Sequence, residues 1–110
     1  MHFPDAVTAL SALAHSSRLA VFRLLVRAGE EGVPAGEIAR EIGAVPSTLS
    51  THLNILSQAP LIRVRREGRS LIYAAEYAEM RELLSFLVAD CCAGRPEICA
   101  DLNSSNRCAP

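Results

Sequence analysis

Two short helical patterns, separated by only about three residues, constrain the fold of this chain most strongly. In the first pattern Ile38 and Ile42 lie four residues apart, on one face of a helix that Pro34 can open and Gly43 can end. Pro46 opens a second helix over about 46–58, whose inward positions are Leu49, Leu53 and Leu56. A short turn containing glycine between two short helices is typical of a helix-turn-helix.

The flanking segments extend this pair into a larger pattern. Two helices are expected before it. The first covers 3–14, where Phe3, Val7 and Leu10 have helical spacing, and the second is capped by Ser16 or Ser17 and runs to about Ala28; residues 30–33 are expected to form a loop. After the pair, alternation over 61–66 and 70–75 predicts two strands joined by a turn at Glu67-Gly68. A last helix is expected over about 77–91. The sequence therefore predicts a mainly α fold with one β-hairpin, four helices preceding the hairpin and one following it, which is a winged helix-turn-helix.

The composition agrees with one small helical domain. Half of the 110 residues are apolar and only 5% are aromatic, so the core must consist mainly of Leu, Ile, Val and Ala. A small helical domain with spare apolar surface often completes its core by forming a dimer. The sequence has neither a secretory signal nor an apolar stretch of 18 residues, and we expect a soluble, cytoplasmic protein without a membrane partner.

The charge is distributed unevenly along the chain. The formal net charge is −1, but residues 43–75 hold four arginines against one acid, which gives this section a local charge of +3. The chain has no lysine, and the planar arginine side chain is suited to phosphates and guanine edges. The alternative is a solvated, charged hairpin without a binding role.

The predicted fourth helix and the hairpin together offer a candidate DNA-binding surface. The helix has polar side chains that can reach base edges or phosphates, namely Ser47, Thr48, Ser50, Thr51, His52 and Asn54. Its N-terminus adds free N–H groups for a phosphate. The hairpin adds Arg65, Arg66 and Arg69, which we expect to contact the DNA backbone. An ordinary exposed helix face would more often contain Glu, Lys and Ala than Ser and Thr, which are weaker helix formers.

Three segments, 13–19, 46–53 and 66–73, carry a resemblance to a known family. Their motifs resemble those of the ArsR/SmtB family of metal-responsive repressors, in the same order and spacing, and the resemblance extends over about residues 5–92. It implies a homodimer through the first and last helices, bound to a palindromic operator that it leaves when an inducer binds. The chain has no nucleophile–base pair, paired carboxylates or phosphate-binding glycine loop, so we expect neither an enzyme nor an organic cofactor.

All four cysteines lie in the last 20 residues, at positions 91, 92, 99 and 108. Disulfides would need an oxidising compartment, for which the sequence gives no sign. Gly94 and Pro96 favour a turn that would bring Cys99 toward Cys91 and Cys92, and three convergent thiolates select soft ions. Trivalent arsenic prefers three sulfurs in a pyramidal arrangement, whereas Zn²⁺ would need a fourth ligand. We assign no role to Cys108.

The resemblance also narrows the choice of metal site. Many arsenic repressors of the family carry Cys-Val-Cys on the third helix, but residues 33–38 contain no cysteine, and the last helix lacks the Asp/His pattern of the zinc-responsive members. What remains resembles a branch with a Cys-Cys pair and a nearby third cysteine, which is associated with As(III) and Sb(III). This predicts a DNA-binding and dimerisation domain over 1–92 and a cysteine-containing tail over 93–110, with As(III) or Sb(III) as the inducer.

Two alternatives stay open. The same repressor fold could use the cysteines as a thiol redox or persulfide switch, or to sense Cu(I) or Zn(II). A protein of another class, a thiol-rich metal-binding module that does not bind DNA, would also fit the net charge of −1.

Overall fold

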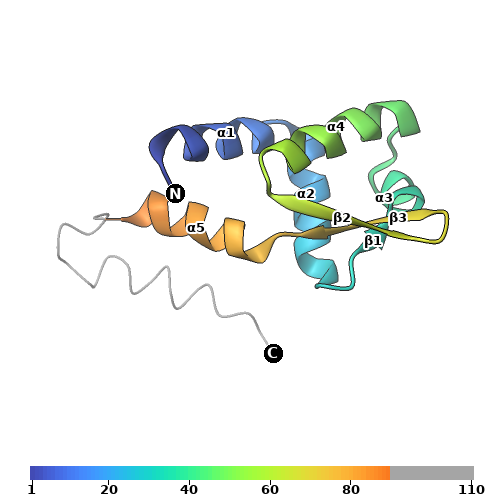
Figure 1. The fold of residues 1–110 in the computed structure, drawn as a ribbon. Coiled ribbons are helices and arrows are strands. Elements are labelled where there is room, and N and C mark those ends of the chain that lie inside the picture. Colours follow the sequence, from blue (N-terminus) through green and yellow to red (C-terminus); the bar gives the residue numbers. More distant parts are fainter. Residues whose placement is uncertain (90–110) are drawn as a thin grey trace.

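The computed structural model describes residues 1–89 (Figure 1). Within this range the chain forms five helices and a three-stranded antiparallel sheet, in the order α1 (Phe3–Leu13), α2 (Ser16–Ala28), β1 (Val33–Pro34), α3 (Ala35–Ile42), α4 (Pro46–Gln58), β2 (Ile62–Glu67), β3 (Ser70–Ala75) and α5 (Tyr77–Val88). The winged helix-turn-helix predicted from the sequence is confirmed, with one strand more than expected.

The additional strand, β1, corrects two expectations about the segment before α3. Val33, expected in a loop, pairs with Tyr73, and Pro34, expected to be the first helical residue, pairs with Ile72. Pro34 has an extended backbone (φ −63°, ψ 147°) and is the N-cap of α3, which begins at Ala35. Local sequence patterns cannot predict such a pairing, because it depends on an edge of β3 that lies about 40 residues away along the chain.

The hairpin is shifted by one residue from its expected position. Glu67 pairs with Ser70, so the two turn residues are Gly68 and Arg69 rather than Glu67 and Gly68. The strands are ordered β1-β3-β2, which places β3 in the centre of the sheet. Figure 1 shows the hairpin projecting from one end of the molecule, and α5 extending toward the opposite end. Helix α5 ends at Val88, before the expected limit of 91.

The core lies between the helices and the inner face of the sheet. The expected inward leucines of α4 are buried, as is Ile38 of α3, which confirms those assignments. Helix α1 buries only alanines, and it leaves Phe3, Val7 and Leu10 exposed. These three residues, which carry the helical spacing seen in the sequence, form an apolar face that stays largely exposed within residues 1–89, although the ring of Phe3 packs against that of Phe86.

Three polar contacts fix the corner between α1 and α2 and attach α5 to it. Arg18 donates from Nε to the carbonyl oxygen of Ala12 at 2.6 Å, and His15 Nδ1 accepts from the backbone N–H of Ser17 at 3.1 Å. His15 therefore caps α2, where a serine was expected to do so. The Tyr77 hydroxyl donates to the carbonyl oxygen of Val26 at 2.8 Å and ties the start of α5 to the end of α2.

Within residues 1–89, no single helix is long and apolar enough to cross a membrane; only α1 and α2 together, bent by 101°, pass by length and composition.

Candidate nucleic-acid interface

Helix α4 presents the polar face that the sequence predicted. Five of the six polar residues assigned to DNA contact are exposed in the structure, namely Ser47, Thr48, Ser50, Thr51 and Asn54. The helix contains no charged residue, and its N-cap, Val45, makes no side-chain hydrogen bond to the first turn. The first N–H groups of α4 are thus left for an outside acceptor, such as a phosphate oxygen. The whole face can approach a groove closely because its side chains are short.

The sixth residue, His52, is an exception, and its placement on the polar surface is wrong. Its side chain is only 8% exposed, because positions 49, 52, 53 and 56 form the inward stripe of the helix. The ring lies against His15 with 4.6 Å between ring centroids. Its buried Nδ1 has no hydrogen-bond partner among the described residues. We therefore treat His52 as a residue that supports the face from beneath.

The surroundings of His52 oppose its protonation. Burial lowers the pKa of the imidazole below its ordinary value of 6.5, and electrostatic repulsion from the His15 and Arg18 side chains lowers it further. No acidic residue occurs in α4 or in α2, so no carboxylate of these helices offsets that repulsion. The neutral form of His52 is therefore the form that the fold favours at neutral pH.

The three arginines assigned to the hairpin differ in how they are held. Arg65 donates from Nε to a carboxylate oxygen of Glu67 at 2.7 Å and from Nη2 to the carbonyl oxygen of Glu31 at 2.8 Å. It connects the hairpin to the loop before β1. Arg66 and Arg69 are exposed and form no ion pair within the part of the chain that the structure describes. These two are the side chains of the hairpin that are free to meet a phosphate.

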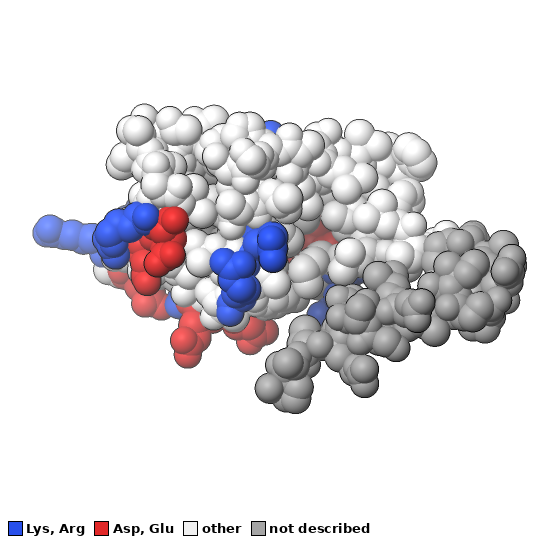
Figure 2. All heavy atoms as spheres, turned by 180° about the vertical axis from the view of Figure 1, so that it is seen from behind, with Lys and Arg blue, Asp and Glu red and all other residues white. Residues whose placement is uncertain are grey.

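The charged side chains are unevenly distributed over the surface. Figure 2 shows arginine side chains projecting at the end of the molecule that carries the hairpin, with acidic side chains beside them, whereas the upper part of this face is almost without charge. Arg40, in the last turn of α3, is also exposed and has no ion pair among residues 1–89. Arg40 was not among the predicted DNA contacts, because only the arginines of 43–75 were considered. Its place in the first helix of the helix-turn-helix makes it a further candidate for such a contact.

The predicted metal ligands cannot be placed. Cys91, Cys92 and Cys99 lie outside the described residues, as does Cys108. Within residues 1–89, no group of three or more His, Cys, Asp or Glu side chains could hold a metal ion. The cysteine cluster therefore stays a prediction from the sequence.

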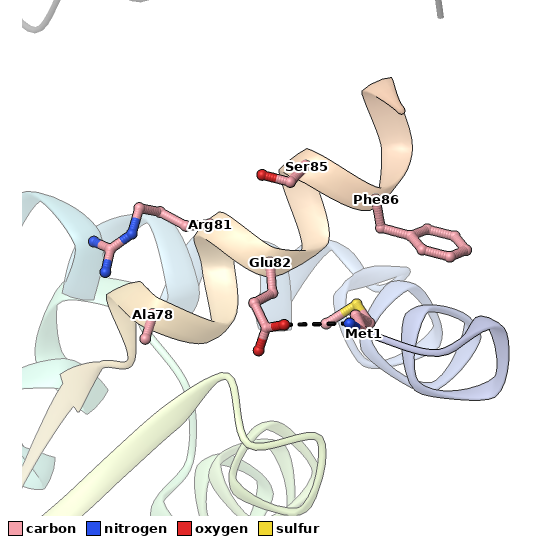
Figure 3. Close-up of a pocket in the computed structure, with 6 residues that line it drawn as sticks. All are labelled: Met1, Ala78, Arg81, Glu82, Ser85 and Phe86. Atoms are coloured by element: carbon pink, nitrogen blue, oxygen red, sulfur yellow. Dashed lines mark hydrogen bonds and ion pairs between the residues drawn. The ribbon is translucent and has the colours of Figure 1, made fainter. Parts of the chain in front are cut away.

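A pocket lies between the start of α1 and α5, and none of its residues belongs to the polar face of α4 (Figure 3). Glu82 points toward the Met1 amine, and the two groups form an ion pair of 3.2 Å, whereas the Arg81 and Ser85 side chains point away from α1. Phe86 packs edge-on against Phe3, with 5.8 Å between ring centroids. The pocket thus marks the contact between the first and last helices.

The helix-turn-helix, the short-chained polar face of α4 and the adjacent arginine hairpin are the parts of a winged helix-turn-helix domain. A family model described as a helix-turn-helix domain matches residues 13–65. An uncharacterized HTH-type transcriptional regulator of Mycobacterium tuberculosis is 34% identical over 74 residues, which cover 66% of this chain and 62% of the relative.

Solved structures identify the family. A homodimeric winged helix-turn-helix DNA-binding domain from Mycobacterium bovis, described as a possible ArsR-family transcriptional regulator, is 30% identical with a TM-score of 0.64, and the match covers 79% of this chain and 80% of that one. An ArsR-like transcriptional regulator from Rhodococcus shares the fold over 97% of both chains, with a TM-score of 0.70 and 19% identity. This chain belongs to the ArsR family of winged-helix transcriptional regulators. The Mycobacterium tuberculosis relative and the two solved structures above are all transcriptional regulators by name. This chain spans 62% of the length of the curated relatives that it matches.

Proposed function

We propose that this chain is a homodimeric repressor that binds a palindromic operator and releases it when As(III) or Sb(III) binds to Cys91, Cys92 and Cys99. The observation that carries the DNA-binding part is the exposed, hydroxyl-rich face of α4 beside the two free arginines of the hairpin, Arg66 and Arg69. Short polar side chains suit base edges and phosphates in a groove, and the guanidinium groups suit the flanking backbone.

A second copy of the chain would cover the apolar face that the protomer leaves exposed. On α1 this face consists of Phe3, Val7 and Leu10, and on α5 it continues with Leu87 and Val88; each is at least 36% exposed. Exposed apolar residues gathered on two helices that contact each other usually mark an interaction site. A dimer through α1 and α5 would present two copies of α4, and a palindromic operator would place its half-sites about 34 Å apart.

The choice of inducer depends on the chemistry of the donor set. Three thiolates match the pyramidal, three-sulfur coordination of As(III) or Sb(III), and thiolates in general select soft ions. The cysteines follow α5 in the sequence, so a metal bound there would act on the helix that we assign to the dimer interface. A cytoplasmic location accompanies this proposal, because thiolate ligands must stay reduced.

The experiment measures operator release by the reduced full chain on a labelled fragment of its own upstream DNA, titrated with As(III), Sb(III), Zn²⁺ and Cu(I). We expect As(III) and Sb(III) to release the DNA. A Cys91→Ser/Cys92→Ser/Cys99→Ser variant should bind DNA as the parent does and ignore arsenite, and Cys108→Ser, the matched control, should respond like the parent.

Each other outcome would select a different function. If arsenite also released the operator from the triple serine variant, the assignment of the metal site to Cys91, Cys92 and Cys99 would be refuted. A response to peroxide or polysulfide alone, with a defined disulfide or sulfur bridge in the mass spectrum, would favour a redox or persulfide sensor. Release by Cu(I) or Zn²⁺ alone would indicate a sensor for that ion. The absence of any salt-dependent binding to the upstream DNA would favour the thiol-rich module that does not bind DNA.

A further inference from the structure

A hollow between α2 and α5 is lined largely by apolar side chains. We name it the α2–α5 pocket; Phe22 and Leu83 are its most buried residues, and Leu13, Val26 and Met80 also line it. Its volume is about 360 Å³, within the range of pockets that hold small organic ligands. The pocket shares no residue with the face of α4 or with the contact between α1 and α5 in Figure 3.

Two arginines border this apolar space. Arg23 and Arg27 lie four residues apart on α2, so their side chains leave the helix on the same side. Both are exposed, and neither forms an ion pair or a hydrogen bond within residues 1–89. Glu41 lines a neighbouring hollow with the same two arginines, yet it lies beyond the 4.0 Å of an ion pair. Two unpaired guanidinium groups beside an apolar pocket are complementary to a molecule with an apolar body and an anionic end.

We infer that the α2–α5 pocket binds a small hydrophobic carboxylate, with its hydrocarbon part among the apolar side chains and its carboxylate on Arg23 and Arg27. Arginine meets a carboxylate through two parallel N–H···O bonds, which a lysine could not provide. The apolar face of a second copy would also fill the pocket, but it would leave both guanidinium groups without a counter-charge. The charge therefore favours the anion as the occupant.

The position of the pocket would allow a bound ligand to affect the DNA-binding face indirectly. Helix α2 packs against both α3 and α4, and α5 carries part of the apolar face that we assign to the dimer. The Tyr77–Val26 hydrogen bond joins the two walls at one end of the pocket. A ligand between these helices would change their separation, so it would alter operator affinity through a site that contains no cysteine. This last effect rests on the proposed function, whereas binding itself does not.

The test measures binding of octanoate to the reduced Cys91→Ser/Cys92→Ser/Cys99→Ser chain in the absence of DNA, by calorimetry and by amide NMR shifts. We expect saturable binding, with shifted amides in α2 and α5. An Arg23→Gln/Arg27→Gln variant should bind octanoate about tenfold more weakly, because charge-assisted hydrogen bonds are lost. The neutral probe 1-octanol should bind weakly, and it should bind this variant and the parent equally. Arg81→Gln, at an exposed arginine of α5 outside the pocket, is the matched control and should bind octanoate as the parent does.

Three results would overturn the inference: no saturable octanoate binding, equal binding by the double glutamine variant, or shifted amides confined to residues outside the pocket. Binding of octanoate to the monomer alone, with none to the dimer separated by sedimentation, would also overturn it, since a second copy would then be the occupant of the pocket. These measurements contain no DNA, so they test octanoate binding whether or not the proposed repressor function is correct.

Discussion

Replacement of Gly32 by alanine should destabilise the protein far more than the same change at Gly43. Both glycines have a positive φ, +78° at Gly32 and +74° at Gly43, so alanine is strained at either position. At Gly43 a new Cβ would meet nothing within 4 Å. At Gly32 it would lie 2.5 Å from the carbonyl oxygen of Tyr73 and 2.9 Å from Ile72 Cγ2. The backbone oxygen belongs to the central strand of the sheet and cannot simply rotate away.

The magnitudes follow from these contacts. The left-handed backbone alone should cost about 1–2 kcal/mol of the free energy of unfolding for Gly43→Ala. Gly32→Ala adds the clash with β3, which is relieved only if β1 separates from it. The pairing of Val33 with Tyr73 is then lost, and Val33, 8% exposed, loses burial worth roughly 1.5–3 kcal/mol. The total for Gly32→Ala should be about 2.5–5 kcal/mol, a large share of a small domain's stability.

Urea unfolding, followed by circular dichroism, measures both variants under the same conditions. The difference between their free energies of unfolding isolates the contact between Gly32 and β3, because the backbone strain is common to both. Equal losses in the two variants would refute the reasoning, and so would intact amide protection of β1 and β3 in Gly32→Ala. Either result would mean that β1 does not depend on the close approach of Gly32.

Three further predictions concern pH, DNA binding and the core. Since the pKa of His52 is lowered in the fold, the unfolded chain binds more protons, and the free energy of unfolding should fall as the pH drops below about 6.5; His52→Gln should show a shallower pH dependence in urea titrations at pH 7.5 and 5.5. Because both protomers of the proposed homodimer carry the change, Arg66→Ala and Arg69→Ala should each reduce the salt slope of DNA binding by about 1.8, measured by fluorescence anisotropy, and Arg81→Ala should leave it unchanged. Leu56→Ala, at a fully buried position, should cost about 2–5 kcal/mol in urea unfolding.

Each of these has a result that would count against it. An unchanged pH dependence in His52→Gln would assign the effect to other groups. Loss of DNA affinity without a change in the salt slope would mean that Arg66 and Arg69 do not contact phosphates. A loss below about 1 kcal/mol in Leu56→Ala would mean that the core refills the cavity, which is uncommon for a leucine at full burial.

The local patterns of the sequence were sufficient for most of the fold. Helix periodicity, Pro46 and Gly43 located α3 and α4, and alternation located the hairpin to within one residue. The polar face of α4 was also readable, because residues three and four apart share one face of a helix, and the positions between the inward leucines therefore point outward. His52 was misplaced because a histidine is polar by composition, although its spacing from Leu49 and Leu56 put it on the inward stripe.

The features that the sequence did not predict depend on contacts between segments that are far apart in the chain. Strand β1 exists because the edge of β3 lies beside it, and Arg65 is held by a carbonyl oxygen 34 residues away, so only Arg66 and Arg69 of the predicted three are free. The apolar face of α1 and the α2–α5 pocket likewise depend on which side of each helix the neighbours cover. Local spacing fixes the direction of a side chain relative to its own helix or strand. What that side chain meets is set by tertiary packing, which the sequence alone does not reveal.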